Sequence, residues 1–249
     1  PFSFPELPTI TRDSSMLRIA IPNKGRLAEE ARELFNDAGL EVRARGERAL
    51  TASLGGEFEA LFVRSQDIPE FVADGAADAG ITGWDLVCEC GRQLDTLMDL
   101  DFGRCRLVVA ARDDSGIASL DDLAGAPRVA TSFPRITRRF FERSGHVVNI
   151  VPISGATEIA PHLGIADIVV DLTSTGSTLR VNGLREVATI LESSARLVTS
   201  ETAATSSKAR ALTDLVDALG SVLRARGMRY LMANVPRTVL DRVKAVAPG

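Results

Sequence analysis

The sequence predicts an α/β protein whose sheets are largely parallel, because two kinds of segment alternate along it. Short apolar segments typical of strands alternate with longer segments whose apolar residues recur every three to four positions, as they do on one face of a helix. Strands joined by helices usually pair in parallel, because the helix returns the chain to the edge where the previous strand began. With 249 residues, of which 45% are hydrophobic, the chain can form one large or two medium domains.

The expected elements follow one another along the chain from residue 17. Strands are expected at residues 17–22, 59–64, 77–82, 106–111, 128–132, 148–154, 166–172 and 228–235. Helices are expected at residues 27–38, 68–75, from 83, 134–145, 156–164, from 179, 207–226 and from 236. Gly39 and Gly145 follow two of these helices, where glycine commonly ends a helix, and Pro134 stands in a first turn, where proline is tolerated.

The composition excludes several classes of function. The formal net charge is -4 and no segment is dominated by Lys and Arg, so a nucleic-acid partner is not expected. No apolar stretch approaches the roughly 18 residues that cross a bilayer, and the N-terminus does not resemble a secretory signal. Three cysteines, Cys88, Cys90 and Cys105, form no even disulfide framework, which favours the cytoplasm. With His146 and His162 they show no metal-ligand spacing, so no protein-bound metal is expected.

One segment carries the strongest chemical signal, because an apolar strand that ends in an acid precedes a loop of small residues. The strand ends near Asp171, the loop TSTGST occupies residues 173–178, and a helix is expected to begin near Leu179. Small residues and Gly176 let backbone N–H groups converge on an anion, and the helix N-terminus adds its positive dipole end. A carboxylate there repels phosphate but suits the vicinal hydroxyls of a ribose, which predicts a ribose 5-phosphate site. A Ser/Thr-rich turn beside a solvated aspartate remains the alternative for this segment alone.

The wider segment resembles the signature of ATP phosphoribosyltransferases. Residues 158–179 read E-x5-G-x-A-x2-V-x-D-L-x2-T-G-x-T-L, which agrees with that signature throughout. Five further segments are similar to motifs of the same family in the same order, namely IPNKGRL (21–27), VRSQDIPEFV (63–72), DAGITGWDL (78–86), TSFPRITRRFF (131–141) and MRYLMANVP (228–236). The resemblance therefore covers nearly the whole chain from Met16.

This resemblance implies two α/β lobes arranged as in a periplasmic binding protein, with mostly parallel sheets and the active site in the cleft between the lobes. The first lobe would be discontinuous, residues 16–109 and 196–235, and residues 110–195 would form the second lobe with the phosphoribosyl pyrophosphate loop. Residues 1–15 would be a disordered tail or an expression remnant. Residues 236–249 resemble the start of the histidine-binding domain of long-form members, so the chain is expected to be the catalytic part of a long form or to come from a lineage without that domain.

The implied reaction is the first step of histidine biosynthesis, in which the 5-phosphoribosyl group of phosphoribosyl pyrophosphate passes to N1 of ATP and pyrophosphate leaves. Such a centre reacts through a cation-like transition state, so control of charge matters more than a strong base. Mg²⁺ would be carried mainly by substrate phosphates rather than by protein ligands. The family also implies a homo-oligomer, either a dimer or an assembly of the hexamer-of-dimers type, and in some members a separate regulatory subunit.

The resemblance also implies roles for individual residues. Asp171 would hold the ribose hydroxyls, and Lys24 and Arg64 would be the cations that face phosphates at the reacting centre. The 5-phosphate would lie in the loop formed by Thr173, Ser174, Thr175, Gly176, Ser177 and Thr178. For Lys24 and Arg64, a solvated loop cation and a surface salt bridge are the alternatives.

Further substrate contacts are expected from five other residues. Arg26 would stand beside Lys24 as a second loop cation. Asp85, with Leu86, would bind the nucleotide or act as a first-turn helix acid. Phe133 occupies a position where the family usually has Tyr, and its ring would stack on adenine or pack in the core. Glu158 belongs to the signature without an assigned role, and helix capping would suffice to explain it.

Two other functions compete with a transferase acting on ATP. A solute-binding or ligand-sensing module without catalysis would share the two-lobed architecture, because a fold does not determine a function. A salvage phosphoribosyltransferase would also place an acidic strand end before such a loop, but those enzymes usually have two adjacent acids, and here Leu172 follows Asp171.

Overall fold

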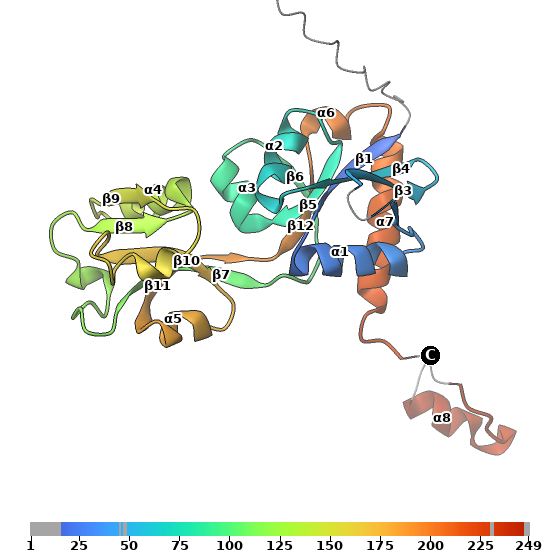
Figure 1. The fold of residues 1–249 in the computed structure, drawn as a ribbon. Helices are drawn as coiled ribbons and strands as arrows, with labels where there is room; N and C mark the ends of the chain where they lie inside the picture. Colours follow the sequence, from blue (N-terminus) through green and yellow to red (C-terminus); the bar gives the residue numbers. More distant parts are fainter. Residues whose placement is uncertain (1–15, 45, 47–48, 230–231, 247–249) are drawn as a thin grey trace, which may run out of the picture.

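The computed structural model describes residues 16–44, 46, 49–229 and 232–246. It has two lobes that lie side by side, each built on one sheet (Figure 1). The strand order is β2-β3-β4-β1-β5-β12-β6 in the seven-stranded sheet of lobe I and β11-β7-β10-β8-β9 in the five-stranded sheet of lobe II. The tail expected at residues 1–15 lies outside the described residues. No helix in the described ranges is both long and apolar enough to cross a membrane.

Lobe I is a sheet covered by helices on both faces. Its strands are β1 (Leu17–Pro22), β2 (Arg43–Ala44), β3 (Thr51–Gly55), β4 (Phe58–Val63), β5 (Ala79–Gly83), β6 (Asp95–Asp99) and β12 (Ala195–Thr199). Its helices are α1 (Arg26–Asp37), α2 (Ile68–Ala73), α3 (Trp84–Cys90), α6 (Glu201–Ala204) and α7 (Ala209–Ala225), with the 3-10 turn η1 (Ser65–Asp67) before α2.

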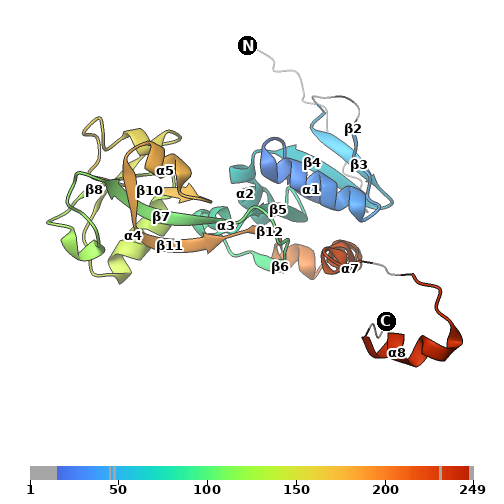
Figure 2. The ribbon, with the colours of Figure 1, turned by 90° about the horizontal axis from the view of Figure 1, so that it is seen from below.

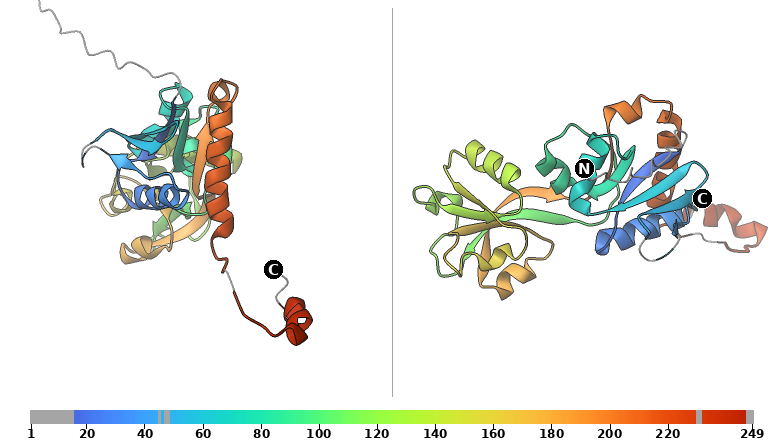
Figure 3. Two further views of the ribbon diagram at one scale, coloured as in Figure 1. Left: turned by 90° about the vertical axis from the view of Figure 1, so that its right-hand side faces the viewer. Right: turned by 45° about the horizontal axis from the view of Figure 1, so that its top comes forward.

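The two faces of this sheet are covered because its strands are apolar on both sides. Ile19 points toward α1 and α7, which supply Phe35 and Leu215 to one buried cluster. Ala20 points to the opposite face, where it packs against Ile68 of α2. Figure 2 shows α1 and α7 on the same side of the sheet, and the left view of Figure 3 shows α7 running along it.

Lobe II is smaller and has one principal helix on each face. Its strands are β7 (Cys105–Arg112), β8 (Arg128–Thr131), β9 (Asn149–Pro152), β10 (Ile168–Thr173) and β11 (Leu184–Ser193), and its helices are α4 (Pro134–Arg143) and α5 (Ser177–Val181), with 3-10 turns η2 (Leu120–Asp122) and η3 (Thr157–Ile159). Phe141 of α4 packs against Val170, and Leu179 of α5 packs on the other face against Val169. After α7, η4 (Arg237–Val239) and α8 (Leu240–Val246) lie apart from both lobes (Figure 3).

The chain crosses between the lobes twice, at residues 100–104 and at Ser194, and the long strands β7 and β11 run together from the crossings into lobe II (Figure 1). The lobe boundary expected after Val109 falls inside β7, which belongs entirely to the five-stranded sheet. Gly103 at the first crossing has φ +65°, and a Cβ there would stand 2.5 Å from a methyl carbon of Leu27. Glycine therefore lets this crossing pass close to α1.

The sheets are mixed, so the expectation of mostly parallel sheets is wrong. Among the described strands, parallel pairing occurs in β4-β1-β5 of lobe I and β10-β8-β9 of lobe II, and the other pairs are antiparallel. The strands that the sequence pattern did not reveal, β2, β3, β6, β11 and β12, all pair antiparallel. Hairpins connect β2, β3 and β4, and the two crossings join β6 to β7 and β11 to β12, so most of these connections contain no helix.

Two further elements differ from expectation. The described part of residues 228–235 contains no strand, and Met228 and Met232 are 72% and 76% exposed, so no neighbouring strand edge supports one there. The short helix expected at residues 156–164 is reduced to η3, because Pro161 interrupts the helical hydrogen bonds and Gly164 adopts φ +67°.

Candidate active site in the interlobe cleft

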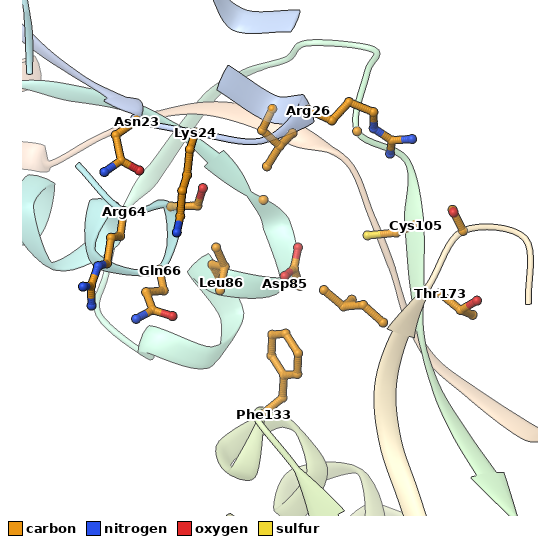
Figure 4. A pocket seen from close by; sticks show the side chains of 16 residues that line it. Asn23, Lys24, Arg26, Arg64, Gln66, Asp85, Leu86, Cys105, Phe133 and Thr173 are labelled. Carbon is orange, nitrogen blue, oxygen red and sulfur yellow. The ribbon is translucent and has the colours of Figure 1, made fainter. Parts of the chain in front are cut away.

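A cavity of about 680 Å³ lies between the lobes and is lined from both of them. Of the residues assigned to the site from sequence, the lining includes Lys24, Arg26, Arg64, Asp85, Leu86, Phe133, Thr173 and Ser174. Figure 4 shows the lobe I side chains facing Phe133 and Thr173 across the opening. The fold thus brings together residues that are as far as 150 positions apart, because Lys24 and Ser174 line the same space.

The lobe I wall carries exposed cations at the ends of two paired strands. β1 and β4 are parallel neighbours with Pro22 opposite Val63, so the residues that follow them emerge at the same edge. Lys24 and Arg64 are both exposed there and, within the described part of the chain, neither takes part in an ion pair. Arg26 makes only a long contact with Glu30, 3.8 Å from nitrogen to oxygen. These side chains are therefore available to an anionic ligand.

Asp85 is a buried carboxylate that borders the cavity. It stands in the first turn of α3 and is only 4% exposed. The Ser193 hydroxyl donates a hydrogen bond to Asp85 Oδ1 at 2.6 Å, and the Asp85 N–H donates to Ser193 Oγ at 3.0 Å. Burial raises the pKa of Asp85 above its ordinary value, while the Ser193 hydroxyl and backbone N–H groups oppose that rise. Since Ser193 ends β11, this acid is attached to the second crossing between the lobes.

Phe133 serves both as cavity wall and as core residue. Its ring borders the cavity (Figure 4) and also packs in the main cluster of lobe II, with 5% of the residue exposed. The Thr131 hydroxyl oxygen accepts the Phe133 N–H at 2.9 Å, which fixes the turn before α4. A ring held in this way presents a fixed apolar surface to a ligand.

Asp171 does not line the cavity, although Leu172 and Thr173, which follow it on β10, both do. Leu172 belongs to the cluster that faces the cavity, so Asp171 points to the face of Val169 and α5. Its Oδ2 accepts a hydrogen bond from the buried Thr157 hydroxyl, and its Oδ1 accepts the Leu172 N–H at 2.7 Å. Burial raises the pKa of Asp171, the Thr157 and Leu172 hydrogen bonds lower it, and the nearby Glu158 charge raises it. The carboxylate of Asp171 is therefore half-buried and fixed by hydrogen bonds. It is not the solvated strand end that the sequence allowed as an alternative.

The loop after Asp171 is shaped by its own hydrogen bonds. Thr173 Oγ1 accepts the Gly176 N–H at 2.8 Å, and the Thr175 and Ser177 hydroxyl oxygens lie 2.9 Å apart. Gly176 has φ +72°, the left-handed conformation that glycine adopts without strain. Thr175, Ser177 and Thr178 are exposed and lie outside the cavity lining, as does Glu158 of η3. The predicted site is therefore divided between the cavity and an adjoining loop surface of lobe II.

Sequence reasoning missed the two hydroxyls that hold the acids. Ser193 is 108 residues from Asp85 and Thr157 is 14 residues from Asp171, so neither is marked by local spacing. Thr157 directly precedes Glu158, the first residue of the signature segment, and this position was the one sequence signal that could have identified Thr157. Asn23, Gln66 and Cys105 also line the cavity without having been singled out for it. Within the described ranges, no group of three His, Cys, Asp or Glu side chains is placed to hold a metal ion.

Comparisons with known sequences identify the family of the chain. The family described as HisG, ATP phosphoribosyltransferase, matches residues 64–221. The ATP phosphoribosyltransferase of Gemmatimonas aurantiaca is 72% identical over 240 residues, covering 94% of this chain and 82% of that protein. That of Natronomonas pharaonis is 50% identical over 234 residues, with the same coverage of 94% and 82%. Membership of the long form stays a prediction.

Comparisons with solved structures separate the fold from the function. The HisG:HisZ ATP phosphoribosyltransferase complex from Thermotoga maritima gives a TM-score of 0.75 at 29% identity, covering 84% of this chain and 99% of that chain. Holo ArgBP from Thermotoga maritima gives 0.53 at 16% identity over 87% and 92% of the two chains, so it shares the two-lobed fold alone. The sequence relatives and the fold agree, and the chain belongs to the ATP phosphoribosyltransferase family, which performs the first step of histidine biosynthesis.

Proposed function

We propose that the phosphoribosyl group passes to N1 of ATP in the interlobe cleft, with phosphoribosyl pyrophosphate held mainly by lobe II and ATP mainly by lobe I. One observation carries this division. The cavity is lined by Lys24 and Arg64 of lobe I, which form no ion pair among the described residues, and by Thr173 and Ser174, where the loop of lobe II begins. Anionic phosphates on both substrates need donors on both walls, and the two walls offer different kinds of donor.

On lobe II, the ribose 5-phosphate end of the substrate would lie against the loop. Thr175, Gly176, Ser177 and Thr178 would supply hydroxyls and backbone N–H groups to the phosphate, and Ser174 would extend this surface into the cavity. Asp171 would accept hydrogen bonds from the ribose hydroxyls, which requires its ionised form. The Thr157 hydroxyl holds one carboxylate oxygen in place and favours that form.

On lobe I, Lys24 and Arg64 would bind phosphates of ATP and stabilise the charge that develops on the leaving pyrophosphate. Arg26 would add a third cation. From lobe II, Phe133 would stack on the adenine ring, with Leu86 of lobe I as an apolar neighbour. Asp85 would orient the nucleotide from its place beside Ser193. No strong base is required, because charge stabilisation and alignment of N1 with the ribose carbon lower the barrier. The negative charge of Glu158 raises the pKa of Asp171 and so opposes the ionised form that the Thr157 hydroxyl favours.

Magnesium fits this arrangement as a substrate-borne ion. The carboxylates near the cleft, Asp85 and Asp171, are already engaged by hydroxyl and N–H donors, whereas the exposed polar groups of the cavity wall are cations, the Ser174 hydroxyl and the Asn23 and Gln66 amides. Such a donor set suits a metal whose ligands are phosphate oxygens and water. When bound, Mg²⁺ would neutralise pyrophosphate charge, and the protein would contribute Lys24, Arg64 and the loop around it.

The proposal extends to assembly and location. We infer a homo-oligomer, as the family implies. The Thermotoga complex contains HisZ beside HisG, and a separate regulatory subunit of that kind is the alternative to the C-terminal domain that long-form membership would supply. Cys88, Cys90 and Cys105 are unpaired, which supports a cytoplasmic location.

The test is a transfer assay with ATP, phosphoribosyl pyrophosphate and Mg²⁺, in which pyrophosphate release and N1-ribosylated ATP are both measured. Parallel reactions replace ATP by free purine bases. We expect product with ATP and none with the bases. Turnover of free bases alone would favour a salvage enzyme, and binding of either ligand without turnover would favour a binding module.

A further inference from the structure

The two lobes are joined by a carboxylate outside the site described above. Glu89 of α3, in lobe I, accepts the backbone N–H of Arg135 on one oxygen and that of Ile136 on the other, both at 2.9 Å. Arg135 and Ile136 stand in the first turn of α4, in lobe II, 46 and 47 residues further along the chain. One side chain of lobe I thus caps a helix of lobe II.

This cap replaces one that the local sequence lacks. The first N–H groups of a helix have no partner within it and are usually satisfied by the side chain of the residue just before. In α4 that residue is Phe133, which has no acceptor in its side chain. A carboxylate at a helix N-terminus also interacts favourably with the helix dipole. Glu89 therefore supplies from the other lobe what Phe133 lacks.

The contact around Glu89 is close and partly apolar. Leu86 and Cys88 of α3 pack against the lobe II cluster that contains Phe133. At the end of α3, Gly91 adopts φ +66°, and a Cβ there would stand 1.9 Å from a guanidinium nitrogen of Arg135. Val87 of the same helix packs in lobe I, so α3 belongs to lobe I and also packs against lobe II.

The position of Glu89 links this contact to the cavity. Asp85 stands four residues earlier on α3, one turn away on the same side of the helix, and Leu86 is its neighbour. Phe133 immediately precedes the helix that Glu89 caps. All three of these residues line the cavity, so the α3–α4 contact fixes the lobe I residues relative to Phe133.

We propose that Glu89 is a positioning residue for the transfer reaction. By capping α4 from the other lobe, it fixes the position of one wall of the cleft relative to the other. The two chain crossings connect the lobes at one side of the cleft, and the α3–α4 contact is an additional link. Glu89 touches no substrate in this proposal, which rests on the proposed use of the cleft. Its loss should impair the step that needs both lobes and spare the binding that needs only one.

The experiment compares Glu89→Ala and Glu89→Gln with Asp122→Asn as the matched control. Asp122 accepts the Ala118 and Ser119 N–H groups at 2.9 and 2.8 Å, but all of these residues lie within lobe II and outside the cavity. Each variant is measured by steady-state kinetics, by titration with phosphoribosyl pyrophosphate alone, and by hydrogen exchange of the α4 first-turn amides.

For Glu89→Ala we expect faster exchange at the Arg135 and Ile136 amides, a fall in kcat of about tenfold, equivalent to about 1.4 kcal/mol, and affinity for phosphoribosyl pyrophosphate alone within twofold of the parent. Glu89→Gln keeps one acceptor oxygen and should lie between Glu89→Ala and the parent. Asp122→Asn should leave kcat and α4 exchange unchanged.

Three results would overturn the inference. Faster exchange with unchanged kcat would make Glu89 a cap for stability alone, and an equal loss of kcat in Asp122→Asn would indicate general destabilisation. Unchanged exchange would mean that the cap does not persist in solution. If the parent itself catalyses no transfer, the proposed function fails instead, and the exchange data still report whether Glu89 joins the lobes.

Discussion

The two walls of the cleft differ in the groups that they offer to an anionic ligand. The lobe I wall presents Lys24 and Arg64 as exposed charges on loops after paired strands, whereas the lobe II wall presents small residues whose loop is set by Gly176 and internal hydrogen bonds. Exposed cations act over a Debye length of about 8–10 Å and tolerate ligand movement. A loop of N–H and hydroxyl donors acts only in contact and requires a fixed shape. We infer that the lobe I wall attracts anionic substrates by its charge, and that the lobe II wall selects among them by its shape.

The two acids repeat this contrast. Asp85 and Asp171 are both held by one hydroxyl, but Ser193 reaches Asp85 from the crossing between the lobes, whereas Thr157 and Asp171 belong to the same lobe. In both acids burial raises the pKa and the hydroxyl hydrogen bond lowers it. The hydrogen bond that holds Asp85 thus depends on the crossing between the lobes, whereas the one that holds Asp171 depends on the local structure of lobe II.

The largest effect is expected from Gly176→Val, which attacks the shape of the lobe II wall. A Cβ at Gly176 would stand 2.8 Å from Glu186 Oε1, and a β-branched residue at φ +72° is strained. We expect the affinity for phosphoribosyl pyrophosphate to fall by at least ~10²-fold, equivalent to about 2.7 kcal/mol, as measured by calorimetry. A folded variant that binds this substrate like the parent would reduce the loop to a turn and remove the contrast between the walls.

The next largest effect is expected from Asp171→Asn, which removes the charge that would receive the ribose hydroxyls. We expect kcat/KM to fall by roughly 10²-fold, about 2.7 kcal/mol of transition-state stabilisation, while the melting temperature changes little. Initial rates at varied phosphoribosyl pyrophosphate measure this. Activity within twofold of the parent would remove Asp171 from the reaction.

A smaller effect is expected from Thr157→Val, which keeps the shape of the side chain and removes the hydroxyl that donates a hydrogen bond to Asp171. Loss of a hydrogen bond to a charged group, roughly 1.5 kcal/mol, should lower kcat/KM by about tenfold at neutral pH. That hydroxyl favours the ionised carboxylate, so its loss raises the pKa of Asp171 and moves the acidic limb of the pH–rate profile to higher pH. An acidic limb at the parent's position would show that Thr157 does not act through Asp171.

The smallest effect is expected from Asp85→Asn, measured as thermal stability against pH. Burial raises the pKa of Asp85 above its value in the unfolded chain, so the ionised acid destabilises the fold as pH rises through the folded-state pKa. Asn stays neutral and its oxygen still accepts the Ser193 hydroxyl. The melting temperature of the variant relative to the parent should therefore rise from acidic to neutral pH, and a difference that is constant with pH would contradict the role of burial.

The sequence predicted the parts of this molecule that depend on local pattern. The strand at residues 17–22 and the helix from Pro134 are present because apolar periodicity and proline placement act within a few residues. It did not reveal β11 and β12, which pair with strands distant in the chain and carry the crossing.

The same limit applies to the site. The signature predicted the loop around Gly176, whereas Ser193, Thr157 and Glu89 act through contacts that only the tertiary structure creates. No composition or spacing rule joins a serine to an acid 108 residues away. Residues that bind within one loop are therefore easier to predict than residues that position other residues.

Calorimetric titration of Lys24→Ala and Thr175→Ala with each substrate alone tests the central claim most directly. If lobe I holds ATP and lobe II holds phosphoribosyl pyrophosphate, Lys24→Ala should weaken ATP by about tenfold and Thr175→Ala should weaken phosphoribosyl pyrophosphate by about tenfold or more, equivalent to roughly 1.5–3 kcal/mol. Thr175→Ala should bind ATP within twofold of the parent, and Lys24→Ala, which also meets the leaving pyrophosphate, should lose less affinity for phosphoribosyl pyrophosphate than for ATP. If both variants weaken the same substrate most, or each weakens both substrates equally, the division between the two walls is wrong.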